Sequence, residues 1–109
     1  MIELTKITDT VDIYAQIIVY ATLKLIKAER AEEYKICSKI NNYIPKIIND
    51  CIDELKTYGD VPFEVYDEIH NVKGYIYGAL SELPNDELQT LLEVSQEIVD
   101  DIKKKKNKI

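Results

Sequence analysis

The sequence predicts an all-α protein, a compact bundle of four to five helices packed around a hydrophobic first helix. Turn-forming residues are scarce, with three Gly and three Pro in 109 residues, which leaves little room for many short strands. Residues 13–26 form an apolar run that only Gln16, Thr22 and Lys24 interrupt. Apolar side chains on such a helix point in nearly every direction, so other helices must cover several of its sides. The run is shorter than the roughly 20 apolar residues that span a bilayer, and we expect no membrane association.

The first helix is expected to begin at Thr8 and Asp9, which are good N-caps, and to extend to about Lys27. Residues 28–40 contain neither Gly nor Pro, so the chain stays compatible with a helix. Residues 9–41 therefore form either one helix or two.

The next break is expected at Asn41-Asn42, before a helix with Pro45 in its first turn and Gly59 after its end. This helix is amphipathic, with apolar residues at Ile44, Ile47, Ile48, Cys51, Ile52 and Leu55.

A further helix is expected to follow Asp60 as cap and Pro62 in its first turn. Its inward seam is predicted at Val65, Ile69, Val72, Ile76, Ala79 and Leu83. Pro84 breaks the chain and Asn85 can cap the last helix. The inward residues of that helix are predicted to be Leu88, Leu91, Leu92, Ser95, Ile98, Val99 and Ile102.

The length fits a single helical domain over residues 1–109, with a short basic tail at 103–109. The N-terminus lacks the basic region of a signal peptide, so a cytoplasmic location is expected. Cys37 and Cys51 stand in no metal-ligand spacing. Because both fall on predicted apolar stripes, we expect buried free thiols.

The charges divide the chain into three parts. Residues 1–49 hold six acids and seven bases, a net of +1, whereas residues 50–101 hold fourteen acids and two bases, a net of −12. The tail adds five lysines, which suit the negative end of a helix dipole or a tether to nucleic acid or anionic lipid. Nucleic-acid binding is not expected, because basic patches elsewhere are missing and phosphate contacts dominate such affinity.

The acidic part predicts a partner protein with a basic surface, since such a field speeds encounter with cationic surfaces. The residues expected to form this acidic surface are Asp50, Asp53, Glu54, Glu64, Glu68, Glu93, Glu97 and Asp101. Small phage-encoded inhibitors, including anti-CRISPR proteins, and bacteriocin immunity proteins have this size and charge, an analogy without a shared motif. The leading hypothesis is a non-enzymatic interaction module of inhibitor or regulator type.

A second candidate surface lies on the helix that contains Gly74 and Gly78. With the Val65–Leu83 seam inward, these glycines point away from the core at about 100° per residue. The proposed partner-binding residues are Asp67, His70, Asn71, Gly74, Tyr75, Tyr77 and Gly78. Glycine permits close backbone approach and tyrosine is enriched at interfaces, so this face predicts a homodimer contact or a heteromeric one. The alternative is that the first helix crosses there and buries the glycines.

Catalytic motifs are weakly represented. Asp67 and His70 have the spacing of a carboxylate–histidine metal pair, but a di-iron bundle needs a second such pair and His70 is the only histidine. We therefore expect no metal, no cofactor and no catalytic residues.

One enzymatic alternative comes from two acidic motifs on consecutive helices. Asp50-x-x-Asp53-Glu54 is followed by Glu64-x-x-Asp67-Glu68, and carboxylates one turn apart on facing helices can hold Mg²⁺. The pair resembles the motifs of MazG-type nucleoside triphosphate pyrophosphohydrolases over about twenty residues, which would imply a magnesium-dependent all-α dimer. Asp50 and Asp53 stand where that family has glutamates, and its doubled glutamate is missing. A purely structural homodimer is the remaining alternative.

Overall fold

The computed structural model describes residues 4–107, and the side chains of residues 5–105. Within this range the chain is all-α, with four helices and no strand: α1 (Leu4–Arg30), α2 (Tyr34–Lys56), α3 (Phe63–Leu80) and α4 (Asn85–Asn107). The predicted fold class is confirmed, with the lower of the two expected helix numbers. None of the described helices has an apolar stretch long enough to cross a membrane.

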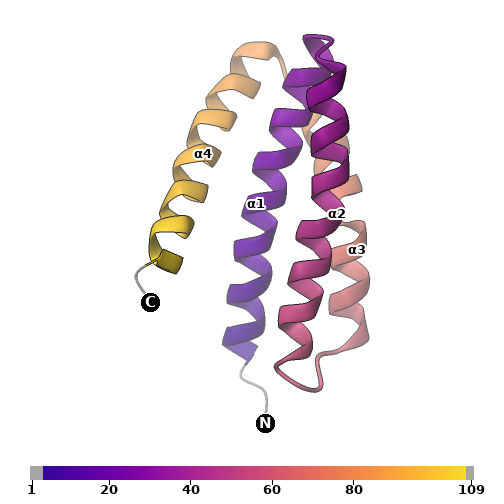
Figure 1. Cartoon of the computed structure of the whole chain (residues 1–109), viewed down its shortest axis with the longest axis vertical. Helices are drawn as coiled ribbons and strands as arrows, with labels where there is room; N and C mark the ends of the chain where they lie inside the picture. The colour runs from indigo at the N-terminus through magenta and orange to yellow at the C-terminus, as the bar shows by residue number, and fades with distance from the viewer. Residues whose placement is uncertain (1–3, 108–109) are drawn as a thin grey trace.

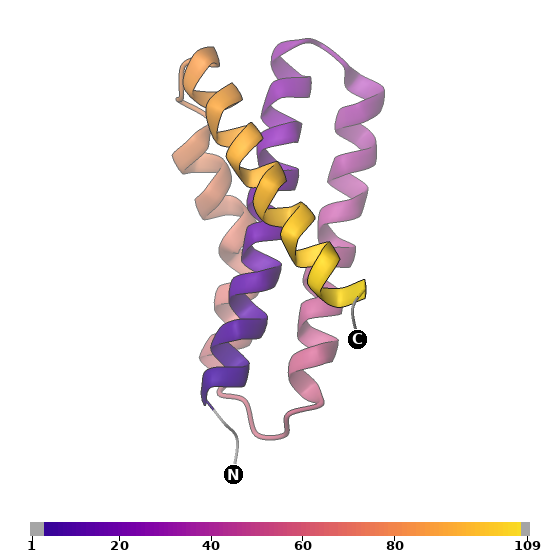
Figure 2. The same ribbon diagram turned by 90° about the vertical axis from the view of Figure 1, so that its left-hand side faces the viewer.

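The first helix is the centre of the bundle. α1 contacts all three other helices, and α2 also contacts α3. Figure 1 shows α1, α2 and α3 running side by side along the long axis of the molecule. Turned by 90°, Figure 2 shows α4 crossing α1 diagonally and ending near α2. The molecule is thus a three-helix bundle with a fourth helix laid across α1.

Burial differs between the two ends of α1. Its C-terminal half is enclosed: Ala21, Thr22, Leu23, Leu25, Ile26 and Ala28 are all buried. In the N-terminal half several apolar residues are only half-buried, among them Ile13, Tyr14, Ala15, Ile17, Val19 and Tyr20. The expectation of enclosure on all sides is therefore correct for only half of the helix, because the diagonal course of α4 carries it away from the other half.

Two polar residues of α1 are buried at little cost in free energy, because the hydroxyl of each forms a hydrogen bond. The Thr22 hydroxyl donates to the Ile18 carbonyl over 2.7 Å, a hydrogen bond within its own helix. The Thr10 and Tyr58 hydroxyls lie 2.8 Å apart and share a hydrogen bond. The second bond ties the beginning of α1 to the loop between α2 and α3.

Residues 9–41 form two helices rather than one. Glu32 adopts a left-handed conformation with φ of 57°. The Glu33 amide donates to the Ala28 carbonyl over 2.9 Å, and the Glu32 amide donates to the Glu29 carbonyl over 3.1 Å. These two bonds form a Schellman motif. α1 begins at Leu4, so the prediction that Thr8 and Asp9 cap it is wrong, and both lie inside the helix.

The predicted break at Asn41-Asn42 is also wrong. α2 continues through both asparagines and contains Pro45 in its interior. Pro45 is exposed, and its missing amide leaves only the Asn41 carbonyl without a helical donor. Burial of Cys37, Ile44, Ile47, Cys51, Ile52 and Leu55 stabilises the helix across this interruption.

The link to α3 corrects another capping prediction. Gly59 has a φ of +94° after the end of α2, which is a conformation that favours glycine. Pro62 itself is the N-cap of α3 and no side chain caps the helix, so Asp60 is not its cap. In the predicted seam Ile69 is buried, whereas Ala79 is exposed, because α3 lies at the edge of the bundle.

Candidate interaction surfaces

α4 has two apolar faces. The inner face packs on α1 through Leu88, Leu92, Ser95 and Val99, all buried. The outer face carries three apolar residues one turn apart, which we call the α4 ridge: Leu91, Val94 and Ile98, which are 40%, 49% and 37% exposed. Leu91 and Ile98 were predicted to face inward, and this is wrong. α4 packs mainly on one helix, α1, so a single neighbour cannot cover so wide an apolar arc.

The α4 ridge has negative charge along one side. Residues 85–102 contain six carboxylates and no base, a net of −6. At about 100° per residue, Glu87 and Asp101 fall beside the ridge and Glu97 about a quarter turn away, and all three are exposed. The helix thus shows an apolar line with an acidic border.

Hydrogen bonds from α1 fix the beginning of α4. Arg30 donates to the Asn85 side-chain oxygen over 2.7 Å and to the Ser81 carbonyl over 2.9 Å. The Lys27 ammonium donates to the Gln89 side-chain oxygen over 3.0 Å. The Asn85 side-chain oxygen, which was expected to cap α4, therefore accepts a hydrogen bond from Arg30.

The glycine face of α3 is open. Gly74 and Gly78 are exposed, and a Cβ added at either would meet nothing within 4 Å, so the first helix does not bury them. Asp67, His70, Asn71 and Tyr75 are exposed as well, Tyr75 to 74%. The Asn71 amide donates to the Asp67 carbonyl over 2.9 Å, within the same helix.

Tyr77 does not belong to this face. It is half-buried and packs against buried residues of α1. Its hydroxyl donates to the Glu29 carboxylate over 2.8 Å, and this hydrogen bond, together with burial, raises the pKa of Tyr77. Tyr77 therefore joins α3 to α1, and the prediction that it flanks the glycines on a free surface is wrong.

His70 occupies a different position from the glycines. It lines a hollow of about 240 Å³ between α2 and α3, together with Asn41, Pro45 and Lys73. This hollow is the place where Pro45 deprives the Asn41 carbonyl of its helical donor.

The remaining predicted acidic residues divide by exposure. Asp50, Asp53, Glu64, Glu68, Glu93, Glu97 and Asp101 are exposed, whereas Glu54 is half-buried. Glu54 lies beside Tyr14, whose pKa is raised by burial and by its hydrogen bond to Glu54. Among the described residues no three His, Cys, Asp or Glu side chains are close enough to hold a metal ion, so the carboxylates of the two acidic motifs do not gather into such a group.

Both cysteines are free and buried, as predicted. Cys51 faces a cavity of about 100 Å³ between α1, α2 and α3, lined mostly by apolar side chains. Burial, and to a lesser degree Glu54, raises the pKa of Cys51 to about 11. The thiol is therefore protonated at neutral pH and is a weak nucleophile.

Val94 is the ridge residue that the sequence reasoning missed. Its spacing of three from Leu91 and four from Ile98 is itself a signal of a second stripe, which the stronger inner stripe of the same helix concealed. Comparison with known families, with curated proteins and with solved structures finds no match for this chain.

Proposed function

We propose that the protein is a non-enzymatic interaction module, of inhibitor or regulator type, which binds a basic partner protein through the α4 ridge. The observation that carries the proposal is an exposed apolar line, Leu91, Val94 and Ile98, on a helix with six carboxylates and no base over residues 85–102.

The mode of binding follows from this geometry. An amphipathic helix binds a groove through apolar anchors at positions such as i, i+3 and i+7, which is the spacing of the three ridge residues. Full burial of a Leu, Val or Ile side chain contributes about 1.5–3 kcal/mol. Because the ridge side chains are already half-covered, burying the rest of each would contribute about 1 kcal/mol to the binding free energy. The surrounding carboxylates pair with lysine or arginine at the edge of the groove.

The charge of α4 contributes mainly to the rate of association and to the choice of partner. A field of one sign raises the association rate and disfavours partners of like charge. Salt screens such contacts over about 8–10 Å at ordinary ionic strength. Partner binding should therefore weaken as salt rises, while the apolar contacts of the ridge persist.

A second candidate is self-association through the glycine face of α3, as part of a homodimer. The open space over Gly74 and Gly78 permits close approach of another backbone, and the exposed Tyr75 beside them supplies contact area.

A crosslinking experiment distinguishes the two surfaces. A photoreactive residue replaces Val94 in one variant and Tyr75 in a matched control, and each is irradiated in an extract of the native cells. We expect a basic protein to crosslink from position 94 and not from position 75, and to be lost when Leu91 and Ile98 are both changed to serine. Crosslinking to a second copy of the chain from position 75 favours the homodimer. A partner captured equally well from both positions, or unaffected by salt and by the serine changes, contradicts the proposed function.

A further inference from the structure

A second apolar hollow lies on the opposite side of α4 from the ridge, beside the middle of α1. It measures about 330 Å³ and is shared by α1, α2 and α4. Its lining residues are Ile17, Tyr20, Ala21, Lys24, Lys39, Ile40, Tyr43, Val99 and Lys103. Figure 2 shows the end of α4 approaching α2 in this region. The volume lies at the lower end of the range of small-molecule pockets.

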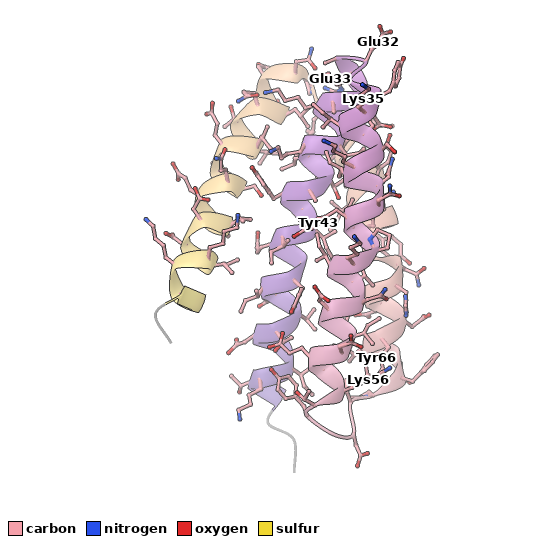
Figure 3. All side chains as sticks on the ribbon, viewed as in Figure 1. Glu32, Glu33, Lys35, Tyr43, Lys56 and Tyr66 are labelled. Carbon is pink, nitrogen blue, oxygen red and sulfur yellow. The ribbon has the colours of Figure 1, made fainter. Side chains whose placement is uncertain are left out.

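The floor and the rim of this hollow differ in chemistry. Ile17, Ala21, Ile40 and Val99 give an apolar floor, and Tyr20 and Tyr43 add aromatic rings. Tyr43 is 57% exposed, and Figure 3 shows it on the stretch of α2 that runs beside α1. An aromatic side chain left so far uncovered beside a hollow can close over a bound apolar group.

Three lysines from three helices surround the opening: Lys24, Lys39 and Lys103. The Lys24 ammonium lies 5.3 Å from the centre of the Tyr20 ring, a cation–π contact that holds it at the rim. No ion pair joins any of the three to a carboxylate in the part of the chain that the structure describes.

We propose that this hollow binds a small amphipathic anion, with an apolar or aromatic body on the floor and a carboxylate, phosphate or sulfonate group at the three lysines. The apolar floor disfavours a fully polar ion, since the side chains of Ile17, Ala21, Ile40 and Val99 offer it no hydrogen bond. The unpaired ammonium groups favour an anion over a neutral molecule. The site is independent of the α4 ridge, so either assignment can fail without the other.

The test uses a matched pair of fluorescent probes. Anilinonaphthalene sulfonate has an aromatic body and one negative charge, and N-phenylnaphthylamine has the same body without the charge. We expect the sulfonate to bind the intact protein about tenfold more tightly than the amine, which corresponds to about 1.4 kcal/mol. Displacement by decanoate and by decyl phosphate then shows which anionic group the site prefers.

Two variants separate the rim from the floor. Lys39→Gln with Lys103→Gln should weaken binding of the sulfonate about tenfold and leave binding of the amine unchanged. Tyr43→Ser should weaken binding of both probes about fivefold. The charge-matched control is Lys6→Gln with Lys56→Gln, which should bind both probes normally. Lys6 lies in the first turn of α1 and Lys56 is the last residue of α2 (Figure 3), and neither lines the hollow. All four substituted lysines and Tyr43 are exposed, so thermal unfolding should show intact folds. Equal affinity for the two probes, or unchanged sulfonate binding in the Lys39 and Lys103 variant, overturns the proposal.

Discussion

α3 and α4 both pack on the outside of α1, and they leave opposite kinds of surface in solvent. α3 presents Gly74 and Gly78 with open space over both, a surface with little side-chain area. α4 presents an apolar ridge with carboxylates beside it. The difference teaches that exposure alone does not define a docking site. The α4 ridge has uncovered apolar area to lose on binding, whereas the α3 face offers only access.

The largest expected effect separates the inner and outer faces of α4. Leu92→Ala should lower the free energy of unfolding by about 2–5 kcal/mol, because Leu92 is buried against α1. Leu91→Ala should lower it by less than about 1 kcal/mol, since that side chain is 40% exposed. Urea unfolding of the two variants measures both values. Equal losses would show that Leu91 belongs to the core.

The next prediction concerns the glycine face. Gly74→Ala and Gly78→Ala should each raise the free energy of unfolding by about 1 kcal/mol, because glycine is unfavourable inside a helix and the new methyl groups meet nothing. Thermal unfolding measures this gain. Gly74→Leu with Gly78→Leu should also fold, and analytical ultracentrifugation would then show whether self-association depends on the face. A loss of stability in the alanine variants contradicts the open surface.

A smaller effect is expected at the interface of α4 with α1. The Ser95 hydroxyl is buried and has no hydrogen-bond partner among the described residues, which is unfavourable for a polar group. Ser95→Ala should therefore raise the free energy of unfolding by up to about 1 kcal/mol. Chemical denaturation, with Thr90→Ala on the exposed side as control, measures the change. A loss of stability would show that the hydroxyl binds an ordered water.

A pH dependence is also expected on the α3 side of the bundle. Folding raises the pKa of Cys51 from 9.0 to about 11, so the folded state holds this proton more tightly than the unfolded state. Its contribution to stability is complete below pH 9 and declines as the pH rises toward 11. Tyr14, whose pKa is also raised, adds to the decline above pH 10. The free energy of unfolding, measured from pH 8 to 11, should decline less steeply in Cys51→Val than in the unsubstituted protein. An identical decline would show that Cys51 does not contribute to the pH dependence.

The sequence predicted the fold class and most of the core because these depend on periodicity. The α2 stripe of Ile44, Ile47, Cys51, Ile52 and Leu55 is buried as expected. The helix ends were less predictable. Glu32 takes a left-handed conformation usually given to glycine or asparagine, so no residue type marked the turn. Pro45 lies inside a helix because the packing of its neighbours outweighs one missing hydrogen bond.

The candidate surfaces were predictable only in part. The exposure of Gly74 and Gly78 follows from angular position on one helix. Tyr77 and Leu91 were misplaced, because their surroundings depend on the angle at which helices cross. The lysine-rimmed hollow combines residues 17–24, 39–43 and 99–103, three segments whose proximity no local pattern indicates.

The attachment of α4 has a consequence for the dynamics of the chain. Because this helix rests mainly on α1, its backbone amides should exchange with deuterium through a partial opening that leaves the other three helices folded. Such an opening would release Leu23 and Ile26, which pack against α4, and would make exchange of this helix between two molecules the favoured route to swapped dimers.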